Sequence, residues 1–356
     1  MAYINYFSNC QFVKGANQSL ISDLQLQVSY PISNAIFEVL VHLKEHSIEE
    51  CIQFYGAENE EAIRSYIDFV LDRGIGFMDT EIRGELSSLD LQWDSPAEIS
   101  NVIVEYSESQ NYEGEFYQSL FDSNIQALEL RCYDQVDLDR LKAFIASFNG
   151  KVLKYIKVVI PYSLAASPDY LYELVKTNLR VRSILLHSAP SDRETTTYKD
   201  SVEVRYLTRC IDSNAHCGVV RTAYFMTNME LFTESQQHNT CLNRKLAIDR
   251  SGFIKNCPST NQVFGHVDRM SLDQLLQHPD LKKLWFIHKD QIEVCRDCEF
   301  RHICTDCRAF TEKPQDLFSK PLKCGYDPYT STWSEWSTHP LKQAAMLYYE
   351  SEEIKN

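Results

Sequence analysis

The spacing of the cysteines constrains this chain more than any other feature. Seven of its 12 cysteines fall between positions 241 and 324, whereas the other five are scattered singly. Two Cys-x2-Cys pairs, Cys295/Cys298 and Cys304/Cys307, follow each other closely in the sequence. Thiolates that are separated by two residues can bind one metal. The sequence therefore predicts a metal-binding module, either an iron–sulfur centre or a zinc site.

The length and the two ends of the sequence bound the class of protein. A chain of 356 residues is long enough for two or three domains. It has no run of 18 apolar residues and does not begin with a basic segment followed by an apolar one, so we expect neither a membrane span nor a signal peptide. We therefore expect a cytoplasmic protein, in which clustered cysteines bind metal rather than form disulfides.

Acidic residues are concentrated toward the N-terminus. Residues 1–130 carry 22 Asp and Glu against five Lys and Arg, whereas the remainder carries 28 against 30. Because this charge repels phosphate, nucleic acid is not an expected partner. The acidic half suits a basic peptide, although it can also serve solubility alone.

Residues 1–93 have the layout of a winged-helix-like domain. Residues 24–30 alternate apolar and polar side chains, which predicts a half-buried strand that Pro31 ends. Two further short strands are expected near residues 12–15 and 19–22. Three helices are expected, with capping signals at Ser47 and Asn59 and a terminating Gly74, over residues 33–45, from 47 onward and from 59 to 74.

Residues 94–235 read as repeated β–α units. The predicted strands are separated by roughly 25–35 residues, which is the spacing of βαβ crossovers in a parallel sheet. A partial α/β barrel is the expected closure of such units. Strands are expected at residues 102–105, 127–131, 157–160, 183–187 and 219–225, with helices at 138–148 and 169–176.

Residues 236–340 are rich in loops and cysteines, and residues 341–356 form a tail. Residues 247–254 read as a hairpin in which Gly252 supplies a positive-φ turn position. A helix is expected at residues 272–284, and another in the tail after Pro340.

The cysteine pattern resembles a known family. The arrangement Cys-x10-Gly-x4-Cys, gap, Cys-x2-Cys-x5-Cys, gap, Cys resembles the SPASM domain of peptide-modifying radical SAM enzymes, and residues 289–308 are similar to maturases of "grasp-with-spasm" peptide systems. The resemblance implies two auxiliary 4Fe–4S clusters. It assigns Cys295, Cys298, Cys304 and Cys324 to one cluster, and Cys241, Cys257 and Cys307 to the other.

The chain departs from the family pattern at the second cluster. The gap between Cys304 and Cys307 is one residue shorter than usual, and the cysteine usually found shortly before Cys241 is absent, with Ser235 near its place. The fourth ligand is therefore undefined. It can come from His238, Cys217, His216 or a substrate thiol, or the position stays open, or the site is not occupied at all.

The radical SAM motif itself is missing. Such enzymes carry Cys-x3-Cys-x2-Cys after the first barrel strand, but no cysteine occurs between Cys51 and Cys132 here. No S-adenosylmethionine is therefore expected. Together these features predict an α/β protein with an N-terminal winged-helix-like domain, a degenerate partial (β/α) barrel of radical SAM type and a C-terminal cysteine-rich SPASM domain.

The N-terminal layout resembles the RiPP recognition element, a winged-helix domain that binds leader peptides. In that domain the leader adds a strand to a sheet edge and packs against the third helix. The alternative is a wing that only packs on the barrel. The residues that the resemblance implies for peptide binding are Leu24, Gln25, Leu26, Gln27, Val28, Ser29, Tyr66, Phe69 and Val70.

These resemblances imply a non-radical maturation protein for a ribosomally synthesised peptide (RiPP). It would bind the leader of the precursor and present the peptide to an ATP-grasp ligase partner. No phosphate-binding loop is present, so ATP use is not expected of this chain itself. Two alternatives stay open, an iron–sulfur redox enzyme acting directly on the precursor and a zinc-stapled scaffold.

Overall fold

The computed structural model describes residues 1–87 and 89–353. The chain forms two compact units, which are each built from separate stretches of sequence. Unit 1 comprises Met1–Asp94, Val219–Thr240 and Phe286–Asn356, and unit 2 comprises Ser95–Gly218 and Cys241–Trp285. The described residues include no helix with the length and hydropathy needed to cross a bilayer.

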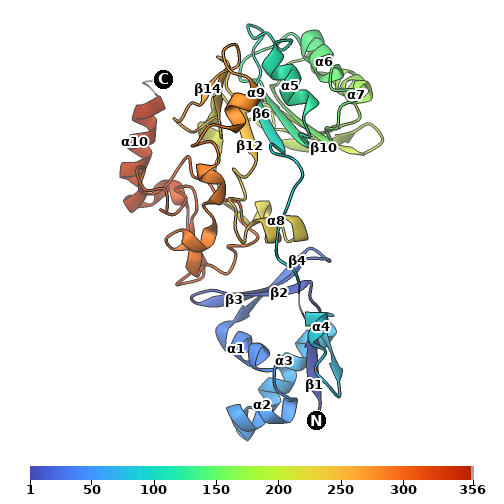
Figure 1. Cartoon of the computed structure of the whole chain (residues 1–356), viewed down its shortest axis with the longest axis vertical. Coiled ribbons are helices and arrows are strands. Elements are labelled where there is room, and N and C mark those ends of the chain that lie inside the picture. The colour runs from blue at the N-terminus through green and yellow to red at the C-terminus, as the bar shows by residue number, and fades with distance from the viewer. Residues whose placement is uncertain (88, 354–356) are drawn as a thin grey trace. The chain divides into compact units, whose positions relative to one another are not determined.

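The N-terminal part of unit 1 contains two small antiparallel sheets (Figure 1). Strand β1 (Tyr3–Tyr6) pairs with β5 (Gly76–Asp79). The second sheet has the order β2-β3-β4, so β4 is an edge strand. Its strands are β2 (Cys10–Lys14), β3 (Gln18–Asp23) and β4 (Val28–Ser33).

Three helices complete this part, as the sequence predicts. Ser47 and Glu50 form the expected capping box, with both reciprocal hydrogen bonds present. Apolar faces of the helices share one core with residues of β1, β2, β3 and β4. The helices are α1 (Asn34–His42), α2 (Ile48–Tyr55) and α3 (Glu60–Asp72), followed by the short α4 (Gly84–Ser87).

The strand predicted over residues 24–30 is wrong in its first half. Residues 24–27 form the turn between β3 and β4, in which Gln27 has a φ of 59°. The Asp23 carboxylate stabilises the turn because it accepts hydrogen bonds from the backbone N–H groups of Gln25 and Leu26, each at 2.9 Å. The alternating pattern misled the prediction because local side-chain bonding to the backbone decided the conformation.

Pro31 lies inside β4 rather than at its end. It stands opposite Leu20 of β3 in the antiparallel register. Proline has no N–H to donate, and an edge strand tolerates it where that position faces away from the sheet. The prediction that Pro31 ends the strand is therefore wrong, because β4 has no second neighbour in its sheet.

Unit 2 is a mixed α/β structure built on a nine-stranded, mostly parallel sheet. The strand order is β10-β11-β9-β8-β7-β6-β12-β13-β14. The six strands from β11 to β12 in this order run parallel to one another. The strands β10, β13 and β14 each run antiparallel to the strands they pair with. The strands are β6 (Asn101–Glu105), β7 (Ala127–Arg131), β8 (Tyr155–Pro161), β9 (Val181–His187), β10 (Arg193–Thr197), β11 (Val202–Tyr206), β12 (Lys245–Ile248), β13 (Phe253–Lys255) and β14 (Gly265–His266).

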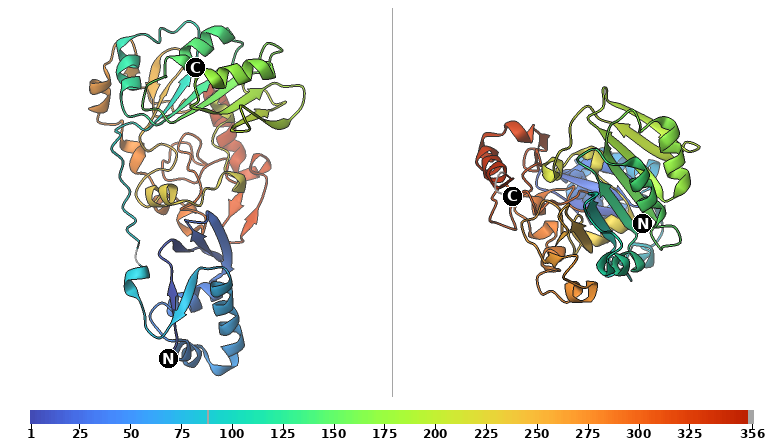
Figure 2. Two further views of the ribbon diagram at one scale, coloured as in Figure 1. Left: turned by 90° about the vertical axis from the view of Figure 1, so that its right-hand side faces the viewer. Right: turned by 90° about the horizontal axis from the view of Figure 1, so that it is seen from above.

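The two faces of this sheet differ. One face is apolar and is covered by helices, as Figure 2 shows, and its core includes Val104, Leu130, Leu120 and Ile145. On the other face Glu129 of β7 pairs in register with Lys157 of β8. The covering helices are α5 (Glu115–Asp122), α6 (Leu138–Ala146), α7 (Pro168–Thr177) and α9 (Leu272–Leu276).

Four of the five strands expected in the middle region are present, and the hairpin around Gly252 is confirmed, with its φ at 84°. The strand expected at residues 219–225 is wrong. Val220 makes only an isolated bridge to Cys324, and Thr222–Tyr224 is a 3-10 turn in unit 1. Instead, β11 and the polar edge strand β10 extend the sheet.

The helix expected at residues 272–284 is shorter than predicted. It ends at Leu276, and Pro279 follows two residues after its C-cap, Gln277. Proline cannot donate an intrahelical hydrogen bond and disfavours helical backbone at the residue before it, which explains the early end. The predicted tail helix is present as α10 (Gln343–Glu353).

The rest of unit 1 packs directly on the sheet β2-β3-β4. Val13, Leu20 and Leu24 share a core with Phe232 and Ile303. The backbone N–H of Ala16 donates to the Asp297 carbonyl at 2.8 Å, and Arg301 donates to the Lys14 carbonyl at 2.7 Å. Regular elements here are α8 (Met229–Glu234), β15 (Tyr326–Asp327) and β16 (Thr332–Trp333).

Candidate metal centre

Four cysteines of unit 1 line one pocket. They are the four that the sequence assigns to the first centre, and the pocket has an empty volume of about 370 Å³. Cys295 and Cys304 are buried, and Cys298 and Cys324 are partly exposed. The walls are otherwise mainly apolar or aromatic, formed by Val220, Val294, Phe225, Phe300, Tyr326, Pro328 and Trp333.

Tight backbone turns bring these cysteines to the pocket. Cys295 opens a 3-10 turn, and the N–H of Cys298 donates to the Cys295 carbonyl at 3.0 Å. The N–H of Cys304 donates to the Phe300 carbonyl, also at 3.0 Å. Cys324 arrives from a distant segment through its bridge with Val220. The two-residue spacing thus places both members of the first pair on one wall.

Burial disfavours the thiolate form of the cysteines in this pocket. Burial raises the pKa of the Cys295 thiol to about 12 and also raises the pKa values of Cys298 and Cys304. Thiolates in such an apolar pocket are unfavourable unless a positive group compensates them. A four-sulfur donor set fits iron–sulfur chemistry or zinc, because soft thiolates bind both.

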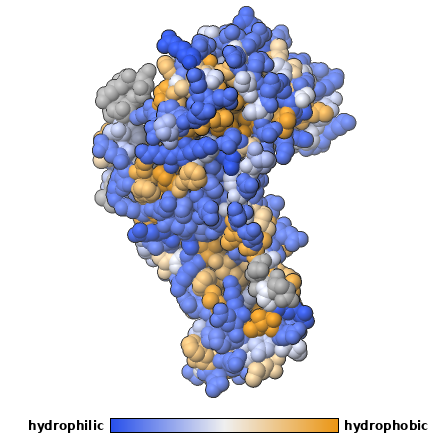
Figure 3. Space-filling model, viewed as in Figure 1, coloured by the Kyte–Doolittle hydropathy of each residue, from blue (hydrophilic) through white to orange (hydrophobic). Residues whose placement is uncertain are grey.

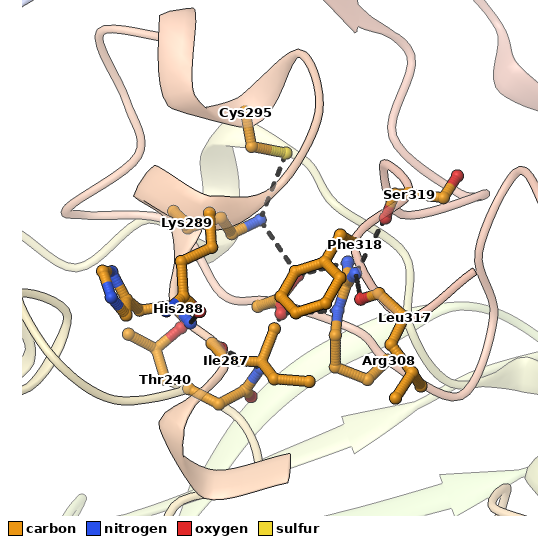
Figure 4. A network of polar contacts seen from close by, with 12 residues as sticks. Thr240, Ile287, His288, Lys289, Cys295, Arg308, Leu317, Phe318 and Ser319 are labelled. Atoms are coloured by element: carbon orange, nitrogen blue, oxygen red, sulfur yellow. Dashed lines mark hydrogen bonds and ion pairs between the residues drawn. The ribbon is translucent and has the colours of Figure 1, made fainter.

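A buried network of charged groups contacts Cys295 (Figure 4). The Lys289 ammonium lies 3.9 Å from the Cys295 sulfur and 3.3 Å from Asp306 Oδ1. Arg308 contacts the same carboxylate at 2.7 Å, and Asn239 donates to it at 2.6 Å. Burial opposes the charge on Lys289, but Cys295, Cys304 and Asp306 raise its pKa well above the ordinary value. The Lys289 ammonium is therefore a fixed cation in the lining of the pocket.

The remaining predicted ligands fall into different units. Cys241 and Cys257 lie in unit 2, and Cys307 lies in unit 1, where it packs beside Phe310 and Leu322. Within the described residues, no group of three or more His, Cys, Asp or Glu side chains is arranged to hold a metal ion. The ligand set of the second centre stays a prediction.

Cys241 has a lysine beside it, as Cys295 does. Lys245 of β12 lies with its ammonium 3.6 Å from the Cys241 sulfur. Burial opposes its charge, but Cys241, Cys257, Glu129 and Cys217 together raise its pKa. In each of two separate groups of cysteines, one lysine ammonium thus contacts a cysteine sulfur: Lys245 contacts Cys241, and Lys289 contacts Cys295.

A polar cavity occupies the carboxyl ends of β6 and β7, where the sequence lacks the radical SAM cysteines. It has an empty volume of about 610 Å³ and is lined by the segments after both strands and by Arg250. Next to it, the Tyr133 hydroxyl donates to buried Glu105 at 2.7 Å. Parallel sheets commonly bind ligands at this edge.

The residues predicted to bind peptide are not all on one surface. Leu24 is buried in the core that includes Phe232, and Val70 is fully buried in the helical core. Leu26 is exposed in the turn, and Val28 is exposed at the start of β4. Rings of Tyr30 and Phe69 meet edge to face at 6.0 Å, so β4 and α3 adjoin there. Gln25 and Gln27 lie in the turn, Ser29 lies in β4 and Tyr66 is partly buried in α3.

Comparison with solved structures finds similarity to Streptococcus suis SuiB. Its crystal structure bound to S-adenosylmethionine matches with a TM-score of 0.36 and 12% identity, covering 90% of this chain and 99% of SuiB. Its structure bound to the precursor peptide SuiA matches with a TM-score of 0.28 and 12% identity, covering 90% and 98%. No known protein family matches the sequence, and no curated protein does.

The cysteine pattern does not point to the charged residues that contact Cys241 and Cys295. Lys289, Asp306 and Arg308 nevertheless fall within residues 289–308, among and beside the predicted ligands. Charged residues within a run of predicted metal ligands were a usable signal, because such groups balance the charge of a metal centre. Lys245 carried a weaker signal, since only its spacing of four residues from Cys241 marked it.

Proposed function

We propose that this protein is a non-radical maturation protein for a ribosomally synthesised peptide. It binds the leader of the precursor along β4 and α3, holds an iron–sulfur centre in the four-cysteine pocket and presents the peptide to an ATP-grasp ligase. The observation that carries the proposal is that an open sheet edge and the four-cysteine pocket belong to one compact unit with a shared core.

The edge strand β4 has the chemistry for adding a peptide strand. Backbone groups on its outer side have no neighbouring strand in the sheet, and Val28 is 38% exposed. Main-chain hydrogen bonds supply affinity in this binding mode, and side-chain pockets supply selectivity. Pro31 removes one donor, so pairing is limited to the residues on either side of it.

Charge and hydrophobic surface support a basic, partly apolar leader. Residues 1–94 carry 15 acidic and five basic side chains. Figure 3 shows hydrophobic residues interspersed among hydrophilic ones over the N-terminal strands and helices, and Leu26 is 63% exposed. Opposite charge accelerates association and makes it sensitive to salt, so the affinity for the leader falls as ionic strength rises.

The test is the affinity of the full chain for the short precursor peptide encoded beside its gene, measured by fluorescence anisotropy with a labelled peptide. We expect binding that Val28→Ser and Phe69→Ala each weaken by about tenfold, since each removes roughly 1–1.5 kcal/mol of contact. Phe54→Ala, which alters an exposed aromatic residue on α2, is the matched control. Absence of binding by the wild-type protein refutes the proposal.

The zinc scaffold and the redox enzyme are separated by metal content and turnover. Iron with matching acid-labile sulfide supports the cluster, whereas zinc without sulfide supports the scaffold. Conversion of the precursor by this protein alone, with an electron donor and no ligase, would establish the redox enzyme instead.

A further inference from the structure

Three cysteines of unit 2 interact with one lysine. Lys245 Nζ lies 3.6 Å from the sulfur of Cys241, four residues earlier in the chain. The same ammonium interacts electrostatically with Cys257, which follows β13, and with Cys217, which follows β11. Three segments that are distant in sequence therefore bring their thiols within electrostatic range of one ammonium.

Hydrogen bonds hold the Cys217 segment against the Cys257 segment. The Asn214 side chain donates to the Pro258 carbonyl at 3.1 Å, and the Ser259 hydroxyl donates to the Asn214 carbonyl at 3.2 Å. Asn214 opens the 3-10 turn that ends at Cys217, whose N–H donates to the Asn214 carbonyl at 3.0 Å. The turn that presents Cys217 is thus built onto the loop that carries Cys257.

Other candidates for the missing ligand are less suitable. The His216 imidazole contacts the Asp212 carboxylate at 3.0 Å. Ser235 is fully buried in unit 1, where its hydroxyl contacts His302 at 3.0 Å. Cys210 lies in the same loop region as Cys217 but is exposed. Cys217 alone among these residues combines a thiol with the contacts described above.

The surroundings suit a negatively charged centre. Arg131 of β7 interacts electrostatically with Cys217, and Lys245 lies on Cys241. An iron–sulfur cluster bound by thiolates carries net negative charge, and nearby cations stabilise it and tune its potential. The first centre has the same device in Lys289.

We propose that Cys217 is a sulfur ligand of the second iron–sulfur centre, together with Cys241 and Cys257. This assignment rests on the iron–sulfur part of the proposed function, and it concerns the ligand that the cysteine spacing leaves undefined. It replaces a ligand just upstream of Cys241 with one that the chain supplies 24 residues earlier, between β11 and α8.

The test compares metal content in four full-length proteins purified without oxygen: wild type, Cys217→Ser, Cys241→Ser and Cys210→Ser. Iron, acid-labile sulfide and zinc are determined per chain, and the reduced proteins are examined by EPR. We expect about eight irons in the wild type and about four in Cys217→Ser and Cys241→Ser, with the same EPR component lost from both. Cys210→Ser, the matched control, keeps the wild-type values.

Several results would overturn the assignment. One is a Cys217→Ser protein with wild-type iron and an unchanged EPR spectrum while Cys241→Ser loses a centre. Another is a wild-type protein with about four irons that Cys241→Ser does not reduce further. Zinc without sulfide removes the cluster on which the assignment rests. A wild-type protein that contains both iron–sulfur centres but does not bind the precursor peptide refutes the leader-binding proposal and leaves the Cys217 assignment standing. The failure of one proposal is therefore distinguishable from the failure of the other.

A second measurement tests the assignment even if the Cys217→Ser variant does not fold, because it uses only the wild-type protein. Alkylation with iodoacetamide is mapped by mass spectrometry before and after a chelator removes the iron. Cys217 should be protected in the loaded protein and become reactive in the stripped protein, whereas Cys210 reacts in both. Equal labelling of Cys217 in both states contradicts the assignment.

Discussion

The ammonium of Lys289 lies 3.9 Å from the sulfur of Cys295, and the Asp306 carboxylate holds it there from the other side. The contact fixes a positive charge beside a predicted cluster ligand. Because reduction adds negative charge to a cluster, a fixed cation stabilises the reduced state.

Replacing Lys289 with Met keeps the length of the side chain and removes the charge. We expect the reduction potential of the first centre to fall, by on the order of tens of millivolts, because the reduced state loses its cation. An EPR-monitored redox titration measures the shift. Lys313→Met is the control, since Lys313 is 61% exposed and pairs with Glu293. An unchanged reduction potential in Lys289→Met would show that the charge of Lys289 does not influence the first centre.

Glu129→Gln should make the unfolding free energy of unit 2 less dependent on pH in the acid range. Although burial disfavours its charge, Arg131 and Lys157 lower the pKa of Glu129 to about 2. Its stabilisation is therefore complete above the unfolded pKa of about 4.3 and is lost as the pH falls toward 2. We expect the variant to be less stable by about 1–3 kcal/mol at pH 7, with the difference shrinking below pH ~4.5.

Urea unfolding of both proteins from pH 7 down to the lowest pH at which they stay folded gives this difference directly. Glu173→Gln serves as the control, because Glu173 forms an exposed pair with Lys176. A constant gap between the wild type and Glu129→Gln across the acid range would contradict the assigned pKa.

Asp23→Ala should loosen the turn between β3 and β4. The carboxylate accepts hydrogen bonds from two backbone N–H groups and, at 2.8 Å, from the side chain of Asn9. Their loss should cost about 1–3 kcal/mol in unfolding free energy. Asp23→Asn keeps one acceptor oxygen and should fall between the two proteins in urea denaturation. Equal stability of wild type and Asp23→Ala would show that the turn needs no cap.

Pro31→Val should tighten peptide binding if the leader pairs along β4. The substitution restores a backbone N–H on the edge strand, and one added hydrogen bond contributes about 0.5–1.5 kcal/mol, or roughly a 2- to 10-fold gain in affinity. Fluorescence anisotropy with the labelled precursor peptide measures the change. Unchanged affinity in a correctly folded variant would place the leader away from this part of the edge.

The sequence predicts the parallel strands β6, β7, β8 and β9 of unit 2, whose apolar residues are buried in the helix-covered core, but not the parallel strand β11. It misses β10, whose residues Arg-Glu-Thr-Thr-Thr lie at a polar edge without an apolar pattern. It also misplaces the strand at residues 24–30. There the carboxylate of Asp23 sets the turn through backbone contacts that apolar periodicity does not reveal.

The grouping of cysteines in the candidate metal centre was predictable in part from the sequence, whereas the charged residues beside them were not. Spacing alone gathers Cys295, Cys298 and Cys304, which lie within ten consecutive positions of the sequence. Long-range packing decides the rest, since Cys324 reaches the pocket through Val220, a residue from a predicted barrel strand. The packing of the Cys217 segment against the Cys257 segment depends in the same way on contacts between stretches that are distant in sequence.

The interleaving of the two units has a consequence for synthesis on the ribosome. Unit 2 has all of its residues once Trp285 has been made, whereas the four-cysteine pocket of unit 1 waits for Cys324. The nine-stranded sheet can therefore form while the core that Val13 and Leu20 share with Phe232 still lacks Ile303. If the four cysteines bind a metal centre, all four ligands are present only after the residues of the sheet have been made.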